Sequence, residues 1–448
     1  MVARQWTDDW AKCWNACVGQ YLNRTPNENN LCFHFQLEDF CLYGVFEPHN
    51  GVEAAKTLLQ RMAAEILFQP LAKFSDEEIR DMLRNSFVTV EKAYVENYDG
   101  MIAERTSLQY QLQTLNDTEV NTCMKRIVNK ILNRLKEIDQ HLSGGATVVI
   151  ALVHNNKLFV ANVGEARALL CRTDVNSVLR VVQLSVDHSL YNEDELLRLS
   201  QLGLDVNKLR NAQYLGNQSG TRCLGNYLVK GLYKAFPDIA SASTEPVVAA
   251  PEIHGPILLD STYRFLVLVS AGVHKRVQKM HGCSEQTNKQ LAQVIVENFR
   301  KETNFNNLSR SVLKEIDDDF NEFCQQNNLN PKSNTHMTLL IRNFNFPLPN
   351  DPIFVPQEIC KLKSNKNVVE FNPVVMAKTN TNTDLESEYS NTMDSHMNTN
   401  RTESSDMYPN TRLNNSNRKI KGYVDFSCYY ENVEKAKKEG KPLPSFIK

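Results

Sequence analysis

The sequence lacks any apolar run of about 18 residues, so we expect no helix able to span a membrane. The first ten residues carry Arg4, Asp8 and Asp9 without an apolar core, which predicts no secretory signal there. No excess of one charge exists either, because 50 Lys and Arg face 52 Asp and Glu. A net charge of −2 gives no basic field for nucleic acid or an anionic membrane. The 11 cysteines include no CxxC pair, which favours reduced thiols in a cytoplasmic protein.

The composition of the chain changes near residue 350. Up to that point, apolar residues recur periodically between turns, which predicts a globular domain over 1–350. Over half of the residues between 377 and 417 are Asn, Thr or Ser, and such a stretch buries too little apolar surface to offset its ordering entropy. We therefore expect a disordered linker over 351–418. Aromatic residues return in a third segment, 419–448.

Helical and strand-like patterns both occur within the first 350 residues. A capping box at Ser75 and Glu78 precedes apolar residues at helical spacing up to Tyr94, and a second helical stripe runs from Ile127 to Leu142. Other runs have the apolar character of buried strands, namely 146–153, 157–163, 166–171, 265–270 and 337–344. Strands linked by hairpins, with long helices between them, predict an α+β domain with helices packed on antiparallel sheets.

Six short motifs follow one another in a specific order: YGVFEPHNG (43–51), SGGAT (143–147), LFVANVGEARALL (158–170), LSVDH (184–188), RCLGN (222–226) and FLVLVSAG (265–272). In this order they resemble the motifs of the metal-dependent type 2C protein serine/threonine phosphatases, over about residues 19–345. The resemblance implies a central antiparallel β-sandwich flanked by helices.

The resemblance also identifies positions where metal ligands have been lost. In the family, acidic side chains hold two Mg²⁺ or Mn²⁺ ions that activate the attacking water. The bridging Asp is Glu47 here, one methylene longer, and the Gly after it is Pro48. Two further acidic positions carry Ala271 and Thr335, and an N-terminal motif ends in Asn29 instead of Asp. The resemblance therefore implies a pseudophosphatase with no catalytic residues, no bound metal and no cofactor.

Two other functions stay open at this point. One is a residual or atypical metal-dependent phosphatase that uses Glu47 with an additional ligand such as Asp187 or His336. The other is a module that binds phosphoproteins in competition with active phosphatases. The histidines at 49 and 188 stand where the family keeps histidines, and we expect a structural role for them. The resemblance implies that the pair Asp187-His188 anchors a loop by hydrogen bonds.

The C-terminal segment predicts an amphipathic helix. Tyr423, Phe426, Tyr430 and Val433 fall on one apolar stripe, and a lone helix of this length is marginal in water. A flexible tether followed by such a helix favours insertion into the groove of a partner. The pattern YVDFxxYY (423–430) closely resembles the kinase-binding motif of a non-enzymatic member of the same family.

That second resemblance implies an adaptor that binds the catalytic domain of a TGF-beta-activated MAP kinase kinase kinase and promotes its autophosphorylation. The contact residues that it implies are Tyr423, Val424, Asp425, Phe426, Tyr429, Tyr430 and Val433. Relatives of this kind also bind a p38-type MAP kinase and an inhibitor-of-apoptosis repeat protein, which makes these two further expected partners. The sequence gives no residue-level contacts for either of them.

Overall fold

The computed structural model describes residues 15–22, 25–26, 31–37, 40–116, 122–176, 178–282, 284–330, 336–348 and 370–371. All of them belong to one compact unit, and the second unit of the chain, Val375–Lys421, lies outside the described residues. Asn29, Thr335 and the predicted kinase-binding helix, 419–448, also lie outside them.

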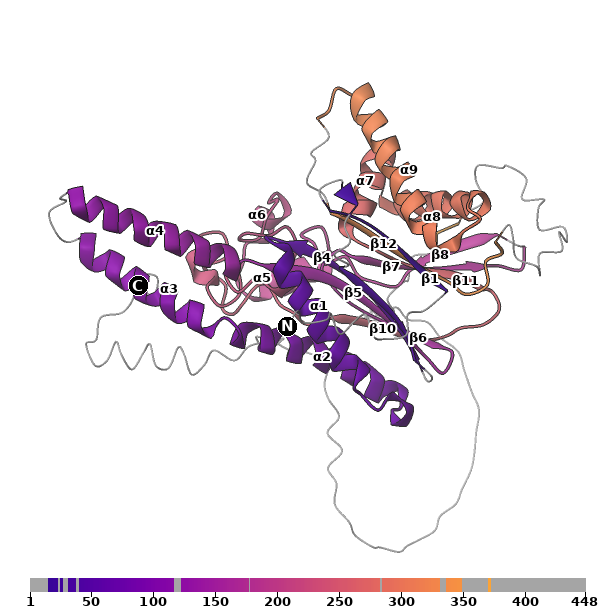
Figure 1. The fold of residues 1–448 in the computed structure, drawn as a ribbon, viewed down its shortest axis with the longest axis horizontal. Coiled ribbons are helices and arrows are strands. Elements are labelled where there is room, and N and C mark those ends of the chain that lie inside the picture. The colour runs from indigo at the N-terminus through magenta and orange to yellow at the C-terminus, as the bar shows by residue number, and fades with distance from the viewer. Residues whose placement is uncertain are drawn as a thin grey trace, which may run out of the picture. The chain divides into compact units, whose positions relative to one another are not determined.

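Two sheets form the centre of the domain (Figure 1). One has the order β10 (Glu252–Leu258), β6 (Lys157–Val163), β5 (Gly145–His154), β4 (Phe40–His49), β3 (Cys32–Gln36), with β9 (Leu224–Gly225) beside β5. The other has the order β13 (Glu370–Phe371), β8 (Leu179–Gln183), β7 (Arg167–Thr173), β11 (Tyr263–Val269), β12 (Met337–Asn343), β1 (Ala16–Leu22), β2 (Thr25–Pro26). The pairs are antiparallel apart from β13 with β8, so the predicted antiparallel fold is confirmed.

The central strands carry continuous apolar runs, which explains why each sheet packs on both of its faces. Tyr43 and Val45 of β4 share one buried cluster with Leu266 and Leu268 of β11, and each of these side chains is fully buried. Alternate residues of the same strands point to the outer faces, where helices cover them. The strands are therefore apolar on both faces, as expected for the middle layers of a sandwich.

Helices cover both outer faces of the sandwich. The outer face of the β4–β5 sheet packs on α1 (Val52–Leu67) and α2 (Asp76–Glu96). The outer face of the β11–β12 sheet packs on α7 (Ala271–His281), α8 (Ser284–Lys301) and α9 (Phe305–Gln326). Figure 1 shows these two groups of helices on opposite sides of the sheets. Within the described ranges, no helix is long and apolar enough to cross a membrane.

A long helical hairpin and a smaller subdomain complete the described fold. The hairpin consists of α3 (Asp99–Asn116) and α4 (Thr122–Leu142), which extend away from the sheets in Figure 1. The buried residues of α4 are Ile131, Leu135, Ile138 and Leu142, whereas Ile127 near its far end is 44% exposed. The smaller subdomain contains α5 (Glu193–Gln201) and α6 (Val206–Arg210) around an apolar cluster of its own.

Local signals in the sequence account for several boundaries. The predicted capping box is present, because the Ser75 hydroxyl accepts from the Glu78 amide and the Glu78 carboxylate accepts from the Ser75 amide. The turn predicted at 154–156 joins β5 to β6, with Asn155 and Asn156 at positive φ, where asparagine is tolerated. The two-residue strand β13 lies inside the range predicted as linker and pairs with Arg180 and Val181 of β8.

Candidate functional site

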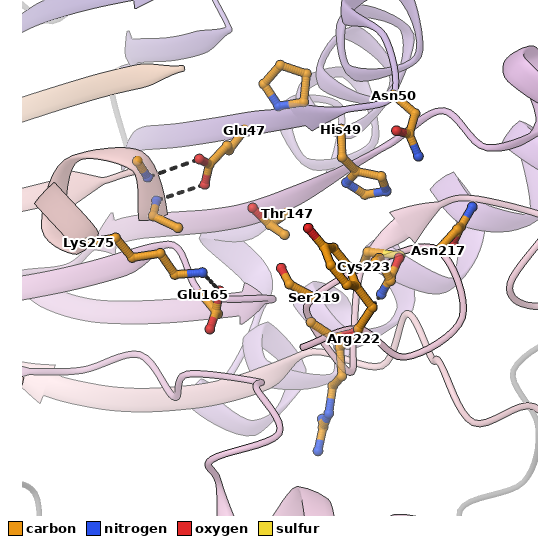
Figure 2. Close-up of a pocket in the computed structure, with 16 residues that line it drawn as sticks. Glu47, His49, Asn50, Thr147, Glu165, Asn217, Ser219, Arg222, Cys223 and Lys275 are labelled. Carbon is orange, nitrogen blue, oxygen red and sulfur yellow. Dashed lines mark hydrogen bonds and ion pairs between the residues drawn. The ribbon is translucent and has the colours of Figure 1, made fainter. Parts of the chain in front are cut away.

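A pocket of about 340 Å³ lies where β4 ends and α7 begins (Figure 2). Three of the positions identified from the family resemblance, Glu47, Pro48 and Ala271, line this pocket together. Glu47 and Pro48 lie on strand β4, and Ala271 lies in the first turn of helix α7. These two elements are more than 200 residues apart in the chain. The other lining residues that matter here are His49, Thr147, Glu165, Tyr214, Ser219, Arg222, Cys223 and Lys275.

The Glu47 carboxylate binds the N-terminus of helix α7. Its Oε2 accepts from the amide of Ala271 at 2.8 Å, and its Oε1 accepts from the amide of Gly272 at 3.0 Å. The N-cap residue Ser270 uses its hydroxyl elsewhere, where it accepts from the amide of Thr338. Glu47 therefore caps the helix from a neighbouring strand, and its negative charge complements the helix dipole. Figure 2 shows both bonds as dashed lines.

Burial raises the pKa of Glu47 above its usual value, because the ionised form loses hydration inside the pocket. The amide of Ala271 opposes this effect first, followed by the positive charge of Lys275. Both interactions stabilise the carboxylate form, so the pocket supplies Glu47 with two backbone donors and one nearby cation.

A second acidic residue of the pocket forms an ion pair. Glu165 lies in the turn between β6 and β7, and its carboxylate accepts from the ammonium of Lys275 on α7. The side chain of Glu165 is 14% exposed and that of Lys275 is 45% exposed, so the pair lies at the mouth of the pocket. Sequence analysis missed this pair. The available signals were an acid in the VGEAR motif and a lysine one helical turn after Ala271.

The two family-like histidines are neutral near pH 7. Burial, assisted by the positive charge of Lys230, lowers the pKa of His49 to about 4. Burial, assisted by Arg222, lowers the pKa of His188 to about 3. The His188 Nδ1 accepts from the amide of Gly164 at 3.1 Å and thereby holds the β6–β7 turn. The His188 bond fits the loop-holding role expected from the sequence, whereas among the described residues the Nε2 of His49 has no hydrogen-bond partner.

A network of ion pairs and hydrogen bonds holds Arg222, one of the residues that line the pocket. The Glu195 carboxylate binds the guanidinium groups of Arg198 and Arg222 and the hydroxyl of Thr221. Arg222 also donates to the carbonyl of Ala250 at 3.0 Å. Although burial would raise the pKa of Glu195, the two arginines outweigh it and hold that pKa well below the usual range. Arg222 is thus bound to a carboxylate inside the protein, which it shares with Arg198.

The residues of this pocket do not fit a pair of divalent cations. Both Glu47 oxygens are occupied by backbone donors, Ala271 offers no side-chain oxygen, and Lys275 brings a positive charge to the same space. Over the described ranges of the chain, no group of three or more His, Cys, Asp or Glu residues could hold a metal ion. The described residues that line the pocket do not include Asp187 or His336, the additional ligands considered from the sequence. Asp187 instead forms a two-bond ion pair with Arg167.

Comparison with known proteins finds phosphatase-like relatives. "Probable protein phosphatase 2C 3" of Paramecium tetraurelia is 27% identical over 220 residues, which cover 47% of this chain and 60% of that protein. "TGF-beta-activated kinase 1 and MAP3K7-binding protein 1" of Caenorhabditis elegans is 24% identical over 270 residues, which cover 57% and 61%. The chain thus spans less than two thirds of the length of either relative.

Solved structures are also similar. A sex-determining protein of C. elegans aligns with a TM-score of 0.48 and 14% identity, over 75% of this chain and 65% of that one. The sequence model of the family described as "Protein phosphatase 2C" matches residues 48–315. Since this match spans more than half of the chain, the chain belongs to the protein phosphatase 2C family.

Proposed function

We propose that this chain is a non-enzymatic adaptor of the protein phosphatase 2C family, a pseudophosphatase that binds a TGF-beta-activated MAP kinase kinase kinase. In this proposal, the segment around Tyr423 to Val433 inserts into a groove of the kinase catalytic domain and promotes kinase autophosphorylation. The name of the C. elegans relative, "TGF-beta-activated kinase 1 and MAP3K7-binding protein 1", supports this partner.

The observation that carries the proposal is the use of the Glu47 carboxylate. In an active enzyme of the family, the acid at this position would bridge two metal ions, whereas here it accepts two backbone amides at the start of α7. Ala271, the residue that donates one of those amides, also stands at a lost ligand position. Each oxygen of the Glu47 carboxylate accepts one of these amides, and Glu47 and Glu165 are the acids among the described lining residues, which is less negative charge than a dimetal centre needs.

The test is co-purification with the kinase catalytic domain. We expect the full chain to co-purify with the kinase and to raise its autophosphorylation, and a chain truncated after residue 418 to do neither. A matched control removes 30 residues from within the linker and leaves 419–448 in place. Kinase binding that survives the truncation would move the interface onto the globular domain and contradict the proposed tail contact.

The second candidate function is a residual metal-dependent serine/threonine phosphatase. Most of the similar relatives are named as phosphatases, which favours this function. Two acidic residues, Glu47 and Glu165, also remain in the pocket. Hydrolysis of a phosphopeptide with Mn²⁺ decides between the two. The further partners expected from the sequence, a p38-type MAP kinase and an inhibitor-of-apoptosis repeat protein, remain proposals of the same kind.

A further inference from the structure

The pocket contains two carboxylates, and each of them faces a positively charged group of helix α7. Of the described residues that line it, Glu47 and Glu165 are the acidic ones. The N-terminus of α7, which carries about half a positive charge, faces Glu47, and the ammonium of Lys275 faces Glu165. Arg222, the other cationic side chain of the pocket, is bound to Glu195. Each carboxylate therefore has a positive partner that the chain itself supplies.

Lys275 reaches the pocket because of its place in helix α7. It follows Ala271 by four residues, so the two side chains lie one above the other on the same face of the helix. Ala271 is small, and it lines the same pocket as Glu47 and Lys275. The charge of Lys275 lowers the pKa of Glu47 as well, although Glu165 is its direct ion-pair partner. One ammonium thus acts on both carboxylates.

We propose that Lys275, together with the N-terminus of α7, is a built-in cation that replaces the metal ions of this fold. It neutralises the pocket acids without activating a water, because an ammonium donates hydrogen bonds but offers no coordination position. It also repels a divalent cation that would enter the same space. The loss of acidic ligands is therefore only part of what keeps metal out, and Lys275 is the other part.

This inference rests on the proposed loss of the dimetal centre. It also predicts which substitutions would restore metal binding. Restoring an acid at Ala271 alone is not expected to restore metal binding, because the new carboxylate would lie one helical turn from Lys275 and pair with it. Restoring the acid and reversing the charge of Lys275 should create binding. The double variant would place two new carboxylates beside Glu47 and Glu165, a set of hard oxygen ligands that suits Mn²⁺.

The experiment compares four full-length proteins: the wild type, Ala271→Asp, Ala271→Asp with Lys275→Asp, and Ala271→Asp with Lys279→Asp. Lys279 lies on the same helix, is exposed and does not line the pocket, so its variant carries the same net charge as the test variant. Binding of Mn²⁺ is measured by calorimetry, and the melting temperature is measured with Mn²⁺ and with a chelator.

We expect Mn²⁺ to bind the Ala271→Asp/Lys275→Asp protein at least tenfold more tightly than the Lys279 control, and to raise only its melting temperature. Equal Mn²⁺ responses of the two double variants, including no response in either, would overturn the proposal. Tight Mn²⁺ binding by the wild type or by Ala271→Asp alone would overturn it too. Metal binding and kinase binding are separate measurements, so the adaptor proposal and this inference can fail independently.

Discussion

Lys230 lies against Glu91 in the interior of the domain, and its ammonium donates to the Glu91 carboxylate while both side chains are at most 4% exposed. Lys230 also donates to the carbonyl of Cys223, and the other oxygen of Glu91 accepts from the amide of Gly225 at 2.7 Å. The pair joins helix α2 to the loop that carries β9 and the floor of the pocket. Burial would lower the pKa of Lys230, but the charge of Glu91 outweighs it, and that pKa lies above its usual value.

Replacing one member of this pair should destabilise the fold strongly. Lys230→Met removes the ammonium and leaves the Glu91 carboxylate buried without its cation, which costs about 3 kcal/mol or more in the free energy of unfolding. Urea denaturation measures the change. Lys208→Met is the control, because Lys208 is 86% exposed and its ion pair with Asp205 spans 4.0 Å. A loss for Lys230→Met no larger than the control's would show that the buried pair is not important for stability.

A second buried acid makes the stability of the domain depend on pH. Glu245 is 6% exposed, and within the described part of the chain neither of its carboxyl oxygens has a hydrogen-bond partner. Burial raises its pKa from 4.5 to about 8, with Lys230 opposing the rise and Glu91 adding to it. The folded protein therefore holds this proton across a range in which the unfolded chain has released it.

The sign of the effect follows from this difference. The contribution of Glu245 to stability is fully present below about pH 4.5 and is lost progressively as the pH rises to about 8. Glu245→Gln keeps the group neutral, so the variant should gain stability relative to the wild type over this range, by up to a few kcal/mol. Denaturation at pH 5, 6.5 and 8 checks this. Parallel curves for the two proteins, like those expected for the exposed control Glu77→Gln, would contradict it.

The sequence was sufficient to predict the fold class, because the signals for it are local. The capping box at Ser75, the apolar run of 157–163 and the turn at Asn155–Asn156 each specify their own element. The family motifs then give the arrangement of these elements. Helix α3 was not predicted, because its apolar residues do not form one continuous stripe and its position depends on packing against α4.

The site was predicted only in part, for a physical reason. The motifs identified Glu47 and Ala271 as altered positions, but the partners of Glu47 are backbone amides, which no side-chain pattern reveals. The pair of Lys275 and Glu165 joins residues 110 positions apart. A lysine at an amphipathic helix surface usually faces water, so its role in the pocket becomes visible only when the sheet brings the β6–β7 turn beside α7.

We predict that the globular domain does not hydrolyse phosphomonoesters in the presence of Mn²⁺. Two acidic positions of the family carry Ala271 and Thr335, and Glu47 is committed to the start of α7. The assay uses p-nitrophenyl phosphate and a phosphopeptide with excess Mn²⁺, with Glu47→Gln as the matched control. Turnover of about 1 s⁻¹ or more that disappears in Glu47→Gln would establish the phosphatase alternative and remove the adaptor's status as a pseudoenzyme.

Phe426 should dominate kinase binding by the C-terminal segment. It is central in the predicted apolar stripe, between Tyr423 and Tyr430, and a buried aromatic anchor accounts for much of the affinity of a small helix interface. Phe426→Ala removes a ring that would bury roughly 150 Å² or more, so we expect a loss of about 3 kcal/mol, about a hundredfold in affinity. Asp425→Ala should cost only about 1 kcal/mol, as a cap or rim charge.

Peptides that cover residues 419–438 test this prediction directly, by calorimetry or fluorescence anisotropy with the kinase catalytic domain. The wild-type peptide should bind alone, more weakly than the full chain, because it pays for helix formation on binding. Asp425→Ala is the matched control, since it alters the neighbouring residue without removing an apolar anchor. Equal affinities of the wild-type and Phe426→Ala peptides would show that another residue is the anchor. If neither peptide binds while the full chain does, the kinase must contact the globular domain. The assignment of the C-terminal segment as the interface is then wrong.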